Sequence, residues 1–361
     1  MKRLILLAAI LGAGCASLPG DAPPSTLAGF PIGIYNVEDP AHLAVMKESG
    51  FDTFFGIARD FQGYERLSRA ARKLGMRMIL DPRPFLDKPA SSTKGWPVLA
   101  WYLQDEPDVN RVTPEALAEF SRKVKAWDPS RLQTFVVGQG SAAKAYGNTS
   151  DALMVDWYPV PHKPLGSVAE QLEIAARAVP KGKPVWMVLQ AFDWSEDGST
   201  KGSAFITRFP TFDEIRFMSY DSILSGAGGL FYFRLPVPGG ETLLDYPERW
   251  QALARVTREL KLLQPVLEGG RPAALPFPPN PDGPSGRAWT HRGRSTLVLA
   301  NRKRNAFQKV PDEALGSEWR PLFSLRRETR ELLKMIGKAH YLRPHQVLVL
   351  EGPEQAAERS W

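Results

Sequence analysis

An aspartate and a glutamate, Asp105 and Glu106, directly follow an apolar run over residues 98–104 and precede Pro107. The aromatic pair Trp101-Tyr102 lies within that run. A glutamic acid with apolar and acidic neighbours has a raised pKa and can give a proton to a poor leaving group such as an alkoxide. The pair therefore predicts an acid–base site with Glu106 as the proton donor. The alternative is a carboxylate that caps the next helix or pairs with an arginine.

Glu106 follows the fourth of eight short apolar runs, most of which lack polar alternation. Parallel strands that are covered on both faces have this pattern. Helical patterns between most of the runs predict right-handed crossovers between parallel strands. Eight such units over residues 29–264 fit an α/β fold of the (β/α)8 barrel type, whose active sites lie at the C-terminal ends of the strands. The predicted strands are 31–37, 51–56, 76–83, 98–104, 133–138, 152–158, 184–192 and 229–235.

The connections 84–97 and 139–150 fit this repeat poorly, because prolines or glycines interrupt them. We expect loops there with at most one turn of helix. Clear helical patterns cover 64–74, 114–127, 168–179, 212–224 and 248–263. An open doubly wound sheet is the alternative architecture, although the sequence contains no glycine-rich phosphate loop that would support it.

The composition changes near Gln264, and residues 265–286 hold many prolines and glycines. We expect a linker there, followed by a small antiparallel β-sandwich-like domain that ends near residue 353. The runs 286–300, 319–323 and 347–351 are its predicted strands. The charged segment 326–338 is compatible with a helix or with a long hairpin.

The N-terminus has a charged start, a short apolar core and then the only cysteine of the chain, Cys15. This order is typical of an export signal, here residues 1–14, and the apolar run is shorter than the ~20 residues that span a bilayer. The segment 11–15 resembles the bacterial lipobox, which implies lipidation of Cys15, a flexible tether over 15–28 and a cell-envelope location. Ala16 favours the outer membrane. An ordinary cleaved signal with an incidental cysteine is the alternative.

Charge and histidine spacing argue against several other functions. The formal charge is +7, but the basic residues are scattered and form no stripe with interleaved aromatics, so we do not expect nucleic-acid binding. The five histidines show no zinc-ligand spacing, and we expect no cofactor. Mg²⁺ or Ca²⁺ on Asp81, Asp105 or Asp156 stays an open alternative that nothing in the sequence requires. The oligomeric state is left open.

The barrel and the segment from Trp101 to Pro107 resemble the large clan of (β/α)8 glycoside hydrolases, where Asn-Glu-Pro commonly follows an aromatic-rich fourth strand. The segments 210–216 and 228–232 also look like the seventh helix and eighth strand of such enzymes. This resemblance covers residues 30–264 and implies cleavage of an O-glycosidic bond in a poly- or oligosaccharide. It also implies that Glu106 is the general acid/base.

The sequence departs from this family at the seventh strand, where the family places a nucleophilic glutamate. Gln190 occupies the matching position and cannot form a glycosyl ester. Asp156, Asp193 and Asp81 are alternative second carboxylates, together with Asp105 itself. Substrate-assisted enzymes that act on 2-acetamido sugars carry an Asp-Glu pair in the order of Asp105-Glu106, so that mechanism is a further alternative. The chain lacks the His and Gly-Gly that precede the pair in those enzymes.

Aromatic and polar residues near the predicted strand ends are candidates for substrate contact, because sugar rings stack on aromatic faces and their hydroxyls need polar partners. For Trp101 and Trp157, packing within the barrel is the alternative. If the missing glutamate reflects lost chemistry, the barrel would bind carbohydrate without cleaving it. A structural envelope lipoprotein would have no cleft. The candidates for substrate contact are Tyr35, Asn36, Asp81, Trp101, Tyr158, Gln190, Trp194, Tyr232 and Arg234.

Overall fold

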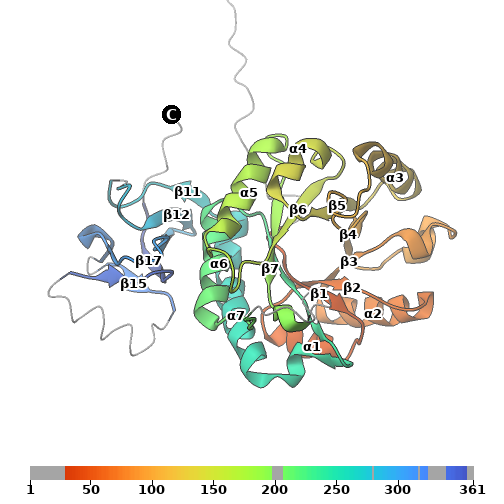
Figure 1. The fold of residues 1–361 in the computed structure, drawn as a ribbon, viewed down its shortest axis with the longest axis horizontal. Helices are drawn as coiled ribbons and strands as arrows, with labels where there is room; N and C mark the ends of the chain where they lie inside the picture. Colours follow the sequence, from red (N-terminus) through yellow and green to blue (C-terminus); the bar gives the residue numbers. More distant parts are fainter. Residues whose placement is uncertain (1–28, 197–205, 279, 316–317, 324–338, 356–361) are drawn as a thin grey trace, which may run out of the picture.

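The computed structural model describes residues 29–196, 206–278, 280–315, 318–323 and 339–355. Eight parallel strands form a closed barrel in the order β1 to β8, and β1 pairs with β8 through Ile32 and Leu230 (Figure 1). The predicted (β/α)8 barrel is therefore confirmed. The strands are β1 (Ile32–Val37), β2 (Thr53–Gly56), β3 (Arg77–Leu80), β4 (Val98–Tyr102), β5 (Leu132–Val137), β6 (Ala152–Trp157), β7 (Val185–Gln190) and β8 (Leu230–Phe233).

Helices surround the barrel except after β3 and β5, where the connections contain only short helical turns. Residues Arg83–Phe85 and Ala90–Thr93 form single 3₁₀ turns, and α4 has only four residues. The expectation of loops with at most a turn of helix at these two places is confirmed. The helices are α1 (His42–Glu48), α2 (Phe61–Leu74), α3 (Pro114–Trp127), α4 (Ala143–Tyr146), α5 (Ser167–Ala178), α6 (Phe212–Leu224) and α7 (Pro247–Gly269).

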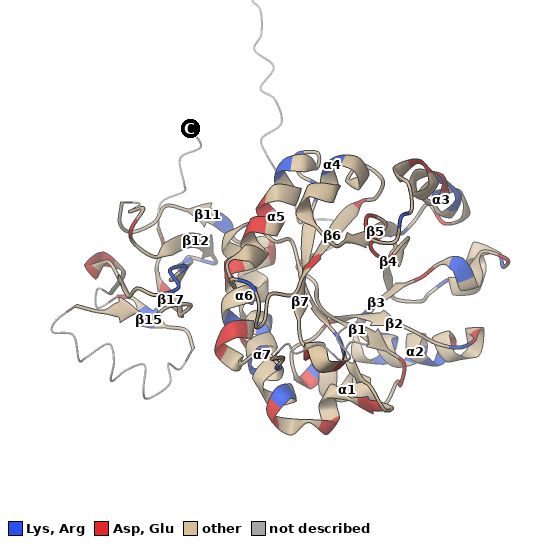
Figure 2. Cartoon of the chain, viewed as in Figure 1, with Lys and Arg blue, Asp and Glu red and all other residues tan. Residues whose placement is uncertain are grey.

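Side chains of each strand alternate between the inside of the barrel and the helices, since the side-chain period of a strand is two residues. On β4, Tyr102 belongs to the inner cluster and Trp101 to the cluster under the helices. Charged residues lie on the helices and loops, and the barrel strands are almost entirely uncharged (Figure 2). The carboxyl groups of the inner face are therefore exceptions to an apolar background.

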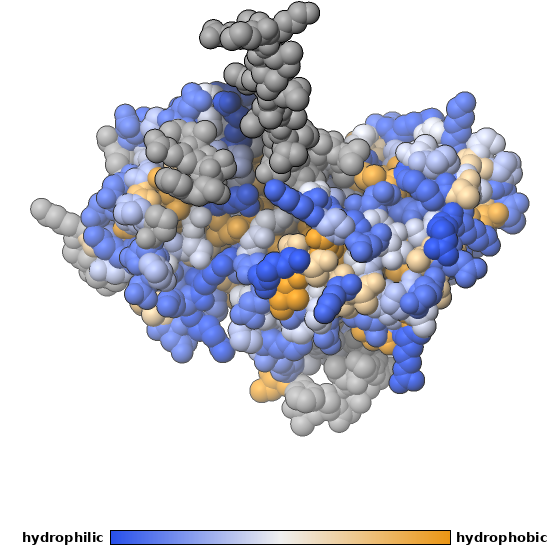
Figure 3. All heavy atoms as spheres, turned by 90° about the horizontal axis from the view of Figure 1, so that it is seen from above, coloured by the Kyte–Doolittle hydropathy of each residue, from blue (hydrophilic) through white to orange (hydrophobic). Residues whose placement is uncertain are grey.

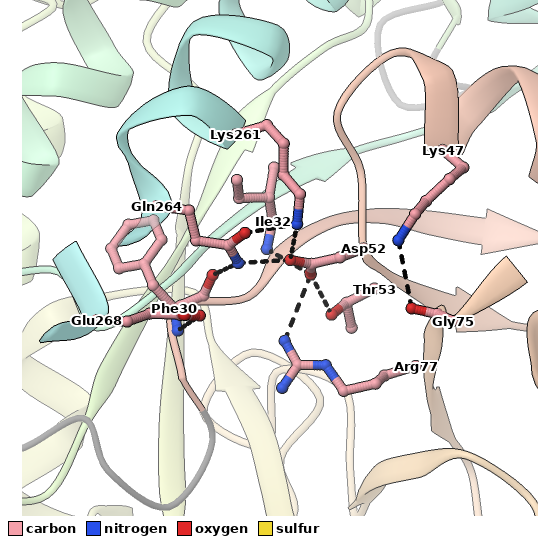
Figure 4. A network of polar contacts seen from close by, with 10 residues as sticks. All are labelled: Phe30, Ile32, Lys47, Asp52, Thr53, Gly75, Arg77, Lys261, Gln264 and Glu268. Atoms are coloured by element: carbon pink, nitrogen blue, oxygen red, sulfur yellow. Dashed lines mark hydrogen bonds and ion pairs between the residues drawn. The ribbon is translucent and has the colours of Figure 1, made fainter. Parts of the chain in front are cut away.

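The N-terminal end of the barrel is closed by polar contacts around Asp52, which precedes β2 (Figure 4). Its carboxylate accepts hydrogen bonds from the backbone of Ile32 at 3.1 Å and from the side chain of Gln264. It also forms ion pairs with Arg77 and Lys261 at 3.4 and 3.3 Å. These contacts connect β1 and β3 to α7, so they fasten the first strands to the last helix.

The C-terminal unit contains a five-stranded antiparallel sheet in the order β11-β12-β13-β17-β15 and a two-stranded sheet of β14 and β16. It packs beside α6 and α7, and the guanidinium of Arg216 donates to the carbonyl of Val347 at 2.7 Å (Figure 1). The predicted antiparallel domain is confirmed. Its strands are β11 (Arg271–Ala273), β12 (Ser285–His291), β13 (Arg294–Ala300), β14 (Gln308–Lys309), β15 (Arg320–Pro321), β16 (Tyr341–Leu342) and β17 (Val347–Pro353).

The expected linker over 265–286 is wrong at its start. Helix α7 continues through Pro265 to Gly269, and β11 follows at once. The partly buried side chains of Val266 and Leu267 pack against the main core. Tertiary packing therefore outweighs the helix-breaking tendency of Pro265. The charged segment 326–338 and the N-terminal residues 1–28, with Cys15, lie outside the described residues.

Within the described residues, no helix is both long and apolar enough to cross a membrane. The large hydrophobic side chains with the highest exposure are far apart in the sequence, and Figure 3 shows small apolar areas among hydrophilic ones on one face. They are Val109, Ile206, Leu262, Phe307 and Leu322.

Candidate active site

A cavity of about 290 Å³ opens at the C-terminal ends of the barrel strands. Three carboxyl groups line it, from Asp105 and Glu106 after β4 and from Asp156 on β6. Its size lies at the low end of small-molecule sites, which usually measure about 300–1,000 Å³. The remaining lining residues are Tyr35, Val136, Tyr158, Val188, Phe192, Trp194 and Phe233.

The loop after β4 holds Glu106 in one conformation. Its backbone has a φ of +37°, which is unfavourable for a residue with a side chain. Backbone N–H groups of Val109 and Asn110 donate to the Glu106 carbonyl at 3.0 and 2.8 Å, and the Asn110 side chain donates to the carbonyl of Asp105 at 2.8 Å. These bonds stabilise the strained backbone and fix the direction of the Glu106 side chain.

Gly138, directly after β5, makes room for the carboxyl group of Glu106. A Cβ at this position would lie 2.9 Å from Oε1 of Glu106 and 2.8 Å from a methyl group of Val109. The Gly138 backbone N–H donates to Asp108 at 3.1 Å, which ties the two loops together. A side chain at position 138 would therefore displace the glutamate.

The side-chain carboxyl groups of Glu106 and Asp156 lie within hydrogen-bonding reach of each other. Burial raises the pKa of Glu106, and the nearby charge of Asp105 raises it further. Burial also raises the pKa of Asp156 well above its usual range, with the charge of Glu106 as the next cause. Their contact lowers the pKa of Glu106 and raises that of Asp156, so Asp156 is the partner that holds its proton more tightly.

Three tyrosine hydroxyl groups surround these carboxyls, from Tyr35, Tyr102 and Tyr158. The Tyr102 hydroxyl donates to Oδ1 of Asp105 at 2.6 Å, and the Tyr158 hydroxyl bonds to Asp156. Burial, followed by nearby negative charge, raises the pKa of all three tyrosines well above the usual value. They therefore remain protonated and act as hydrogen-bond donors.

Aromatic rings continue from the floor of the cavity up its wall. The Tyr158 ring is stacked on that of Phe233, with centroids 5.6 Å apart, and it meets Phe192 edge-on at 5.1 Å. Trp194 lies 5.1 Å from Phe192 at the next step. Such a wall supplies flat apolar surface next to the acidic groups, a combination that suits sugar rings.

The structure brings six of the predicted site residues together around this cavity: Tyr35, Asp105, Glu106, Asp156, Tyr158 and Trp194. Asn36, Asp81 and Arg234 follow strands of the same barrel end but do not line the cavity. Asp81 accepts two hydrogen bonds from Arg83 at 2.8 Å, and Arg234 donates to the carbonyl of Pro236 at 3.2 Å. Of the three aspartates that the sequence left open as metal ligands, Asp105 and Asp156 line the cavity and Asp81 does not.

Three predicted substrate contacts are wrong, because Trp101, Gln190 and Tyr232 are each 0% exposed. Trp101 and Tyr232 point outward from the barrel, where they bond to Asp128 at 3.0 Å and to Ser219 at 2.8 Å. The side-chain amide of Gln190 bonds to the backbone N–H of Val160 at 2.8 Å and to its carbonyl at 2.9 Å, so it holds the loop after β6.

Two further candidates also have structural partners outside the cavity. Asp193 is buried and accepts from the backbone N–H of Ser195 at 2.9 Å, so it does not supply the second carboxylate. The indole of Trp157 donates to Ser167 at 2.8 Å. Among the described residues, no group of three His, Cys, Asp or Glu side chains has an arrangement that could hold a metal ion.

Sequence reasoning missed Phe192, Phe233 and Gly138. Phe233 lies one residue from Tyr232 and on the opposite face of β8, so the period of two residues along a strand was the available signal. Gly138 carries no side chain, so its residue type gave no indication of a role in the site. Its importance depends on the position of Glu106, which comes from a different loop.

No family model matches the chain, and no curated protein matches it in sequence. Among solved structures, it is similar to an α-amylase from Geobacillus thermoleovorans in complex with acarbose, with 13% identity and a TM-score of 0.54 over 91% of this chain and 99% of that one. A GH30 endoxylanase from Clostridium papyrosolvens gives 13% identity and a TM-score of 0.53 over 91% and 96%.

A glycoside hydrolase family 5 protein from Bacteroides vulgatus is also similar, with 12% identity and a TM-score of 0.55 over 93% of this chain and 94% of that one. At such identities the likeness concerns the fold. The chain has the (β/α)8 barrel that these glycoside hydrolases share, followed by a C-terminal antiparallel domain.

Proposed function

We propose that this protein hydrolyses an O-glycosidic bond in a poly- or oligosaccharide, with Glu106 as the general acid/base. One observation carries the proposal: the carboxyl groups of Glu106 and Asp156 lie within hydrogen-bonding reach of each other in an aromatic-walled cavity, and no cation lines that cavity within the described part of the chain. Burial and Asp105 raise the pKa of Glu106, so it holds its proton to a higher pH than an ordinary glutamate and can give that proton to the departing oxygen. The shared fold with glycoside hydrolases supports the same reaction class.

In this proposal Asp156 interacts with Glu106 and does not serve as a second catalytic carboxylate on the opposite side of the sugar ring. Retaining enzymes place their two carboxyl groups ~5–5.5 Å apart and inverting enzymes ~6.5–9.5 Å apart. The carboxyl groups of Glu106 and Asp156 are closer than either spacing, since they are within hydrogen-bonding reach. When Glu106 has given up its proton, Asp156 can share its own proton with the new carboxylate.

Asp105 is the carboxylate that remains for the developing positive charge on the sugar. It lines the cavity, and the Tyr102 hydroxyl fixes its orientation at 2.6 Å. A negative charge beside the ring stabilises an oxocarbenium-like transition state. If the substrate carries a 2-acetamido group, Asp105 would orient that group instead, and the acetamido oxygen would be the nucleophile.

The test is a screen of aryl glycosides and cell-wall fragments with the wild type and with Glu106→Gln. We expect turnover by the wild type and a loss of about 10²–10⁴-fold in the variant, which is the usual contribution of a general acid/base. Glu119→Gln is the matched control, because Glu119 is an exposed glutamate on α3 and should change nothing. Full turnover in Glu106→Gln would remove Glu106 from the mechanism.

A carbohydrate-binding protein without catalysis is the second candidate. The observation that favours it is the short contact between Glu106 and Asp156, which puts neither carboxyl at the spacing of a two-carboxylate mechanism. This candidate predicts saturable sugar binding by the wild type with no turnover of any bound glycoside. A purely structural protein is disfavoured, because it would have no use for an acidic, aromatic cavity.

We also propose that the mature protein is a lipid-anchored component of a bacterial cell envelope, on the outer membrane, with Cys15 as the lipidated residue. The order of charged, apolar and small residues before Cys15 supports this. The test is metabolic labelling with a fatty-acid analogue in cells that express the full chain. Label should enter the wild type and be absent from Cys15→Ser, whereas equal labelling would exclude Cys15 as the anchor.

A further inference from the structure

We propose that the cavity takes a single terminal sugar ring and selects against rings that carry a negative charge. This inference rests on the proposed function and adds the substrate class. It follows from the charge of the lining residues, from an oxygen of Asp156 that needs a donor, and from the size and opening of the cavity.

The described lining residues comprise three carboxyl groups and no lysine, arginine or histidine. The guanidinium of Arg83, near the end of β3, binds Asp81 and the carbonyl of Leu103. Arg234, after β8, donates to the carbonyls of Pro236 and Glu196. Arg234 lies over the Phe233 ring, 5.3 Å from its centroid, but does not line the cavity. A carboxylate or phosphate on the bound ring would therefore meet like charge from the lining residues without a cation among them to compensate it, which disfavours binding.

Asp156 contributes an oxygen atom that lacks a hydrogen-bond donor. Its side chain lines the cavity at 7% exposure, and its Oδ1 atom is buried without a hydrogen-bond partner among the described residues. An acceptor in this state is costly unless a ligand satisfies it. Sugar hydroxyl groups are donors of this kind, and neutral and uronate rings both carry them, so Oδ1 favours a hydroxyl-bearing ligand without contributing to the charge selection.

The volume of about 290 Å³ is at the low end for ligand sites, which suits one ring better than several. The aromatic rings of Phe192, Trp194 and Phe233 form one side of this space. These rings would face the apolar C–H surface of the sugar, while the three carboxyl groups face its hydroxyls.

The described residues that line the cavity are unevenly distributed around the barrel. Its described residues come from β1, from β4 to β8 and from the loops that follow them, and none comes from β2 or β3. Strand β4, which is followed by Glu106, is the neighbour of β3 in the barrel. Glu106 therefore lies at the edge of the lining nearest β3, and our proposal places the rest of the substrate beyond this edge, attached to a terminal ring.

The test measures binding of phenyl thioglycosides, whose sulfur linkage resists hydrolysis, to the wild-type protein by calorimetry. Matched pairs differ only at C6: glucose against glucuronate and galactose against galacturonate, each as both anomers. We expect at least one uncharged ring to bind and its uronate partner to bind at least about tenfold more weakly, because like charges would lie a few ångströms apart. Equal or tighter binding of the uronate would overturn the charge selection.

Asp105→Asn replaces one of the three lining carboxyl groups by a neutral amide and should narrow the difference in affinity between the neutral sugar and its uronate partner. Glu119→Asn is the surface control, which should leave this difference unchanged. Binding of longer oligosaccharides alone, with no monosaccharide glycoside bound, would overturn the single-ring assignment, and so would binding of no sugar at all. These readouts do not depend on turnover. If the proposed hydrolysis is wrong but the binding proposal is right, the protein will bind thioglycosides and will not cleave the corresponding oxygen-linked glycosides.

Discussion

At the N-terminal end of the barrel, the buried carboxylate of Asp52 lies among cations, whereas at the C-terminal end Glu106 and Asp156 face each other. Burial raises the pKa of Asp52, but Arg77, Gln264 and Lys261 together outweigh it and lower that pKa below its usual value (Figure 4). At the other end burial acts with neighbouring negative charge, and both pKa values rise.

The comparison shows that burial alone does not decide what a carboxylate does. Asp52 is 6% exposed and Asp156 is 7% exposed, yet the pKa values of their carboxyl groups move in opposite directions. The partners of each carboxyl group make the difference. Asp52 is stabilised in its ionised form by cations and hydrogen-bond donors and so stabilises the fold, whereas two adjacent carboxyl groups with raised pKa values are available for proton transfer. The four predictions that follow test this contrast.

Asp52→Asn should lower the free energy of unfolding at pH 7 by about 3 kcal/mol, because it leaves Arg77 and Lys261 without their shared carboxylate. The folded-state pKa is lowered, so the stability that Asp52 supplies is present above the unfolded value of about 3.9 and is lost as the pH falls through the folded value. Urea unfolding of wild type and variant should therefore converge in acid. A gap that persists below about pH 2 would show that the charge is not the cause.

Asp221 on α6 sharpens the comparison, because it is buried with only a partial set of partners. Arg302 pairs with Oδ1, while Oδ2 has no partner among the described residues. Burial outweighs Arg302 and raises the pKa of Asp221 from 3.8 to about 6. The folded state therefore binds more protons than the unfolded state between these two values, and Asp221 makes the fold less stable as the pH rises through this window.

Asp221→Asn should therefore raise the free energy of unfolding at pH 7 by up to about 3 kcal/mol, which is the linkage equivalent of this pKa shift. Below the unfolded pKa of about 3.9 it should change stability little. Thermal unfolding at pH 7 and at pH 3.5 would measure the difference. Destabilisation at both pH values would mean that the ion pair with Arg302 outweighs the desolvation of Asp221.

Gly138→Ala should reduce kcat by about tenfold with a smaller effect on KM, because the added Cβ displaces the Glu106 carboxyl. The pH profile of kcat should also shift, since the contact between Glu106 and Asp156 would change. Gly166→Ala is the control, because a Cβ there meets nothing within 4 Å. Unchanged kinetics in Gly138→Ala would show that the position of Glu106 does not depend on this glycine.

Asp156→Asn should raise stability at pH 7 on the order of 1 kcal/mol while lowering activity, the opposite of the loss expected for Asp52→Asn. The folded pKa of Asp156 is raised, so the fold loses stability as the pH rises from the unfolded value of about 3.9 towards the folded value, and loses none below about 3.9. Parallel measurements of melting temperature and turnover would check both parts. A less stable variant at pH 7 would mean that Asp156 is charged and well partnered.

Several features of the fold follow from local sequence. Eight apolar runs separated by helical patterns predicted the barrel, and the poor helical pattern of 84–97 and 139–150 predicted short connections. The acidic pair after the fourth run predicted a site at the barrel mouth, and the cavity lies there. These predictions succeed because strand periodicity and the place where a strand ends are properties of consecutive residues.

Tertiary structure decided in which direction individual side chains point and which partners each carboxylate has. Trp101 and Tyr232 point outward because of the register in which their strands close, and Gln190 turns to the loop at Val160. Asp52 finds Lys261 across 209 residues of sequence, and Glu106 meets Asp156 only once the barrel closes. The sequence by itself determined that an acidic pair would lie at the C-terminal end of the barrel. Only closure of the barrel decided which would meet cations and which would meet each other, because electrostatic partners are set by distance in space.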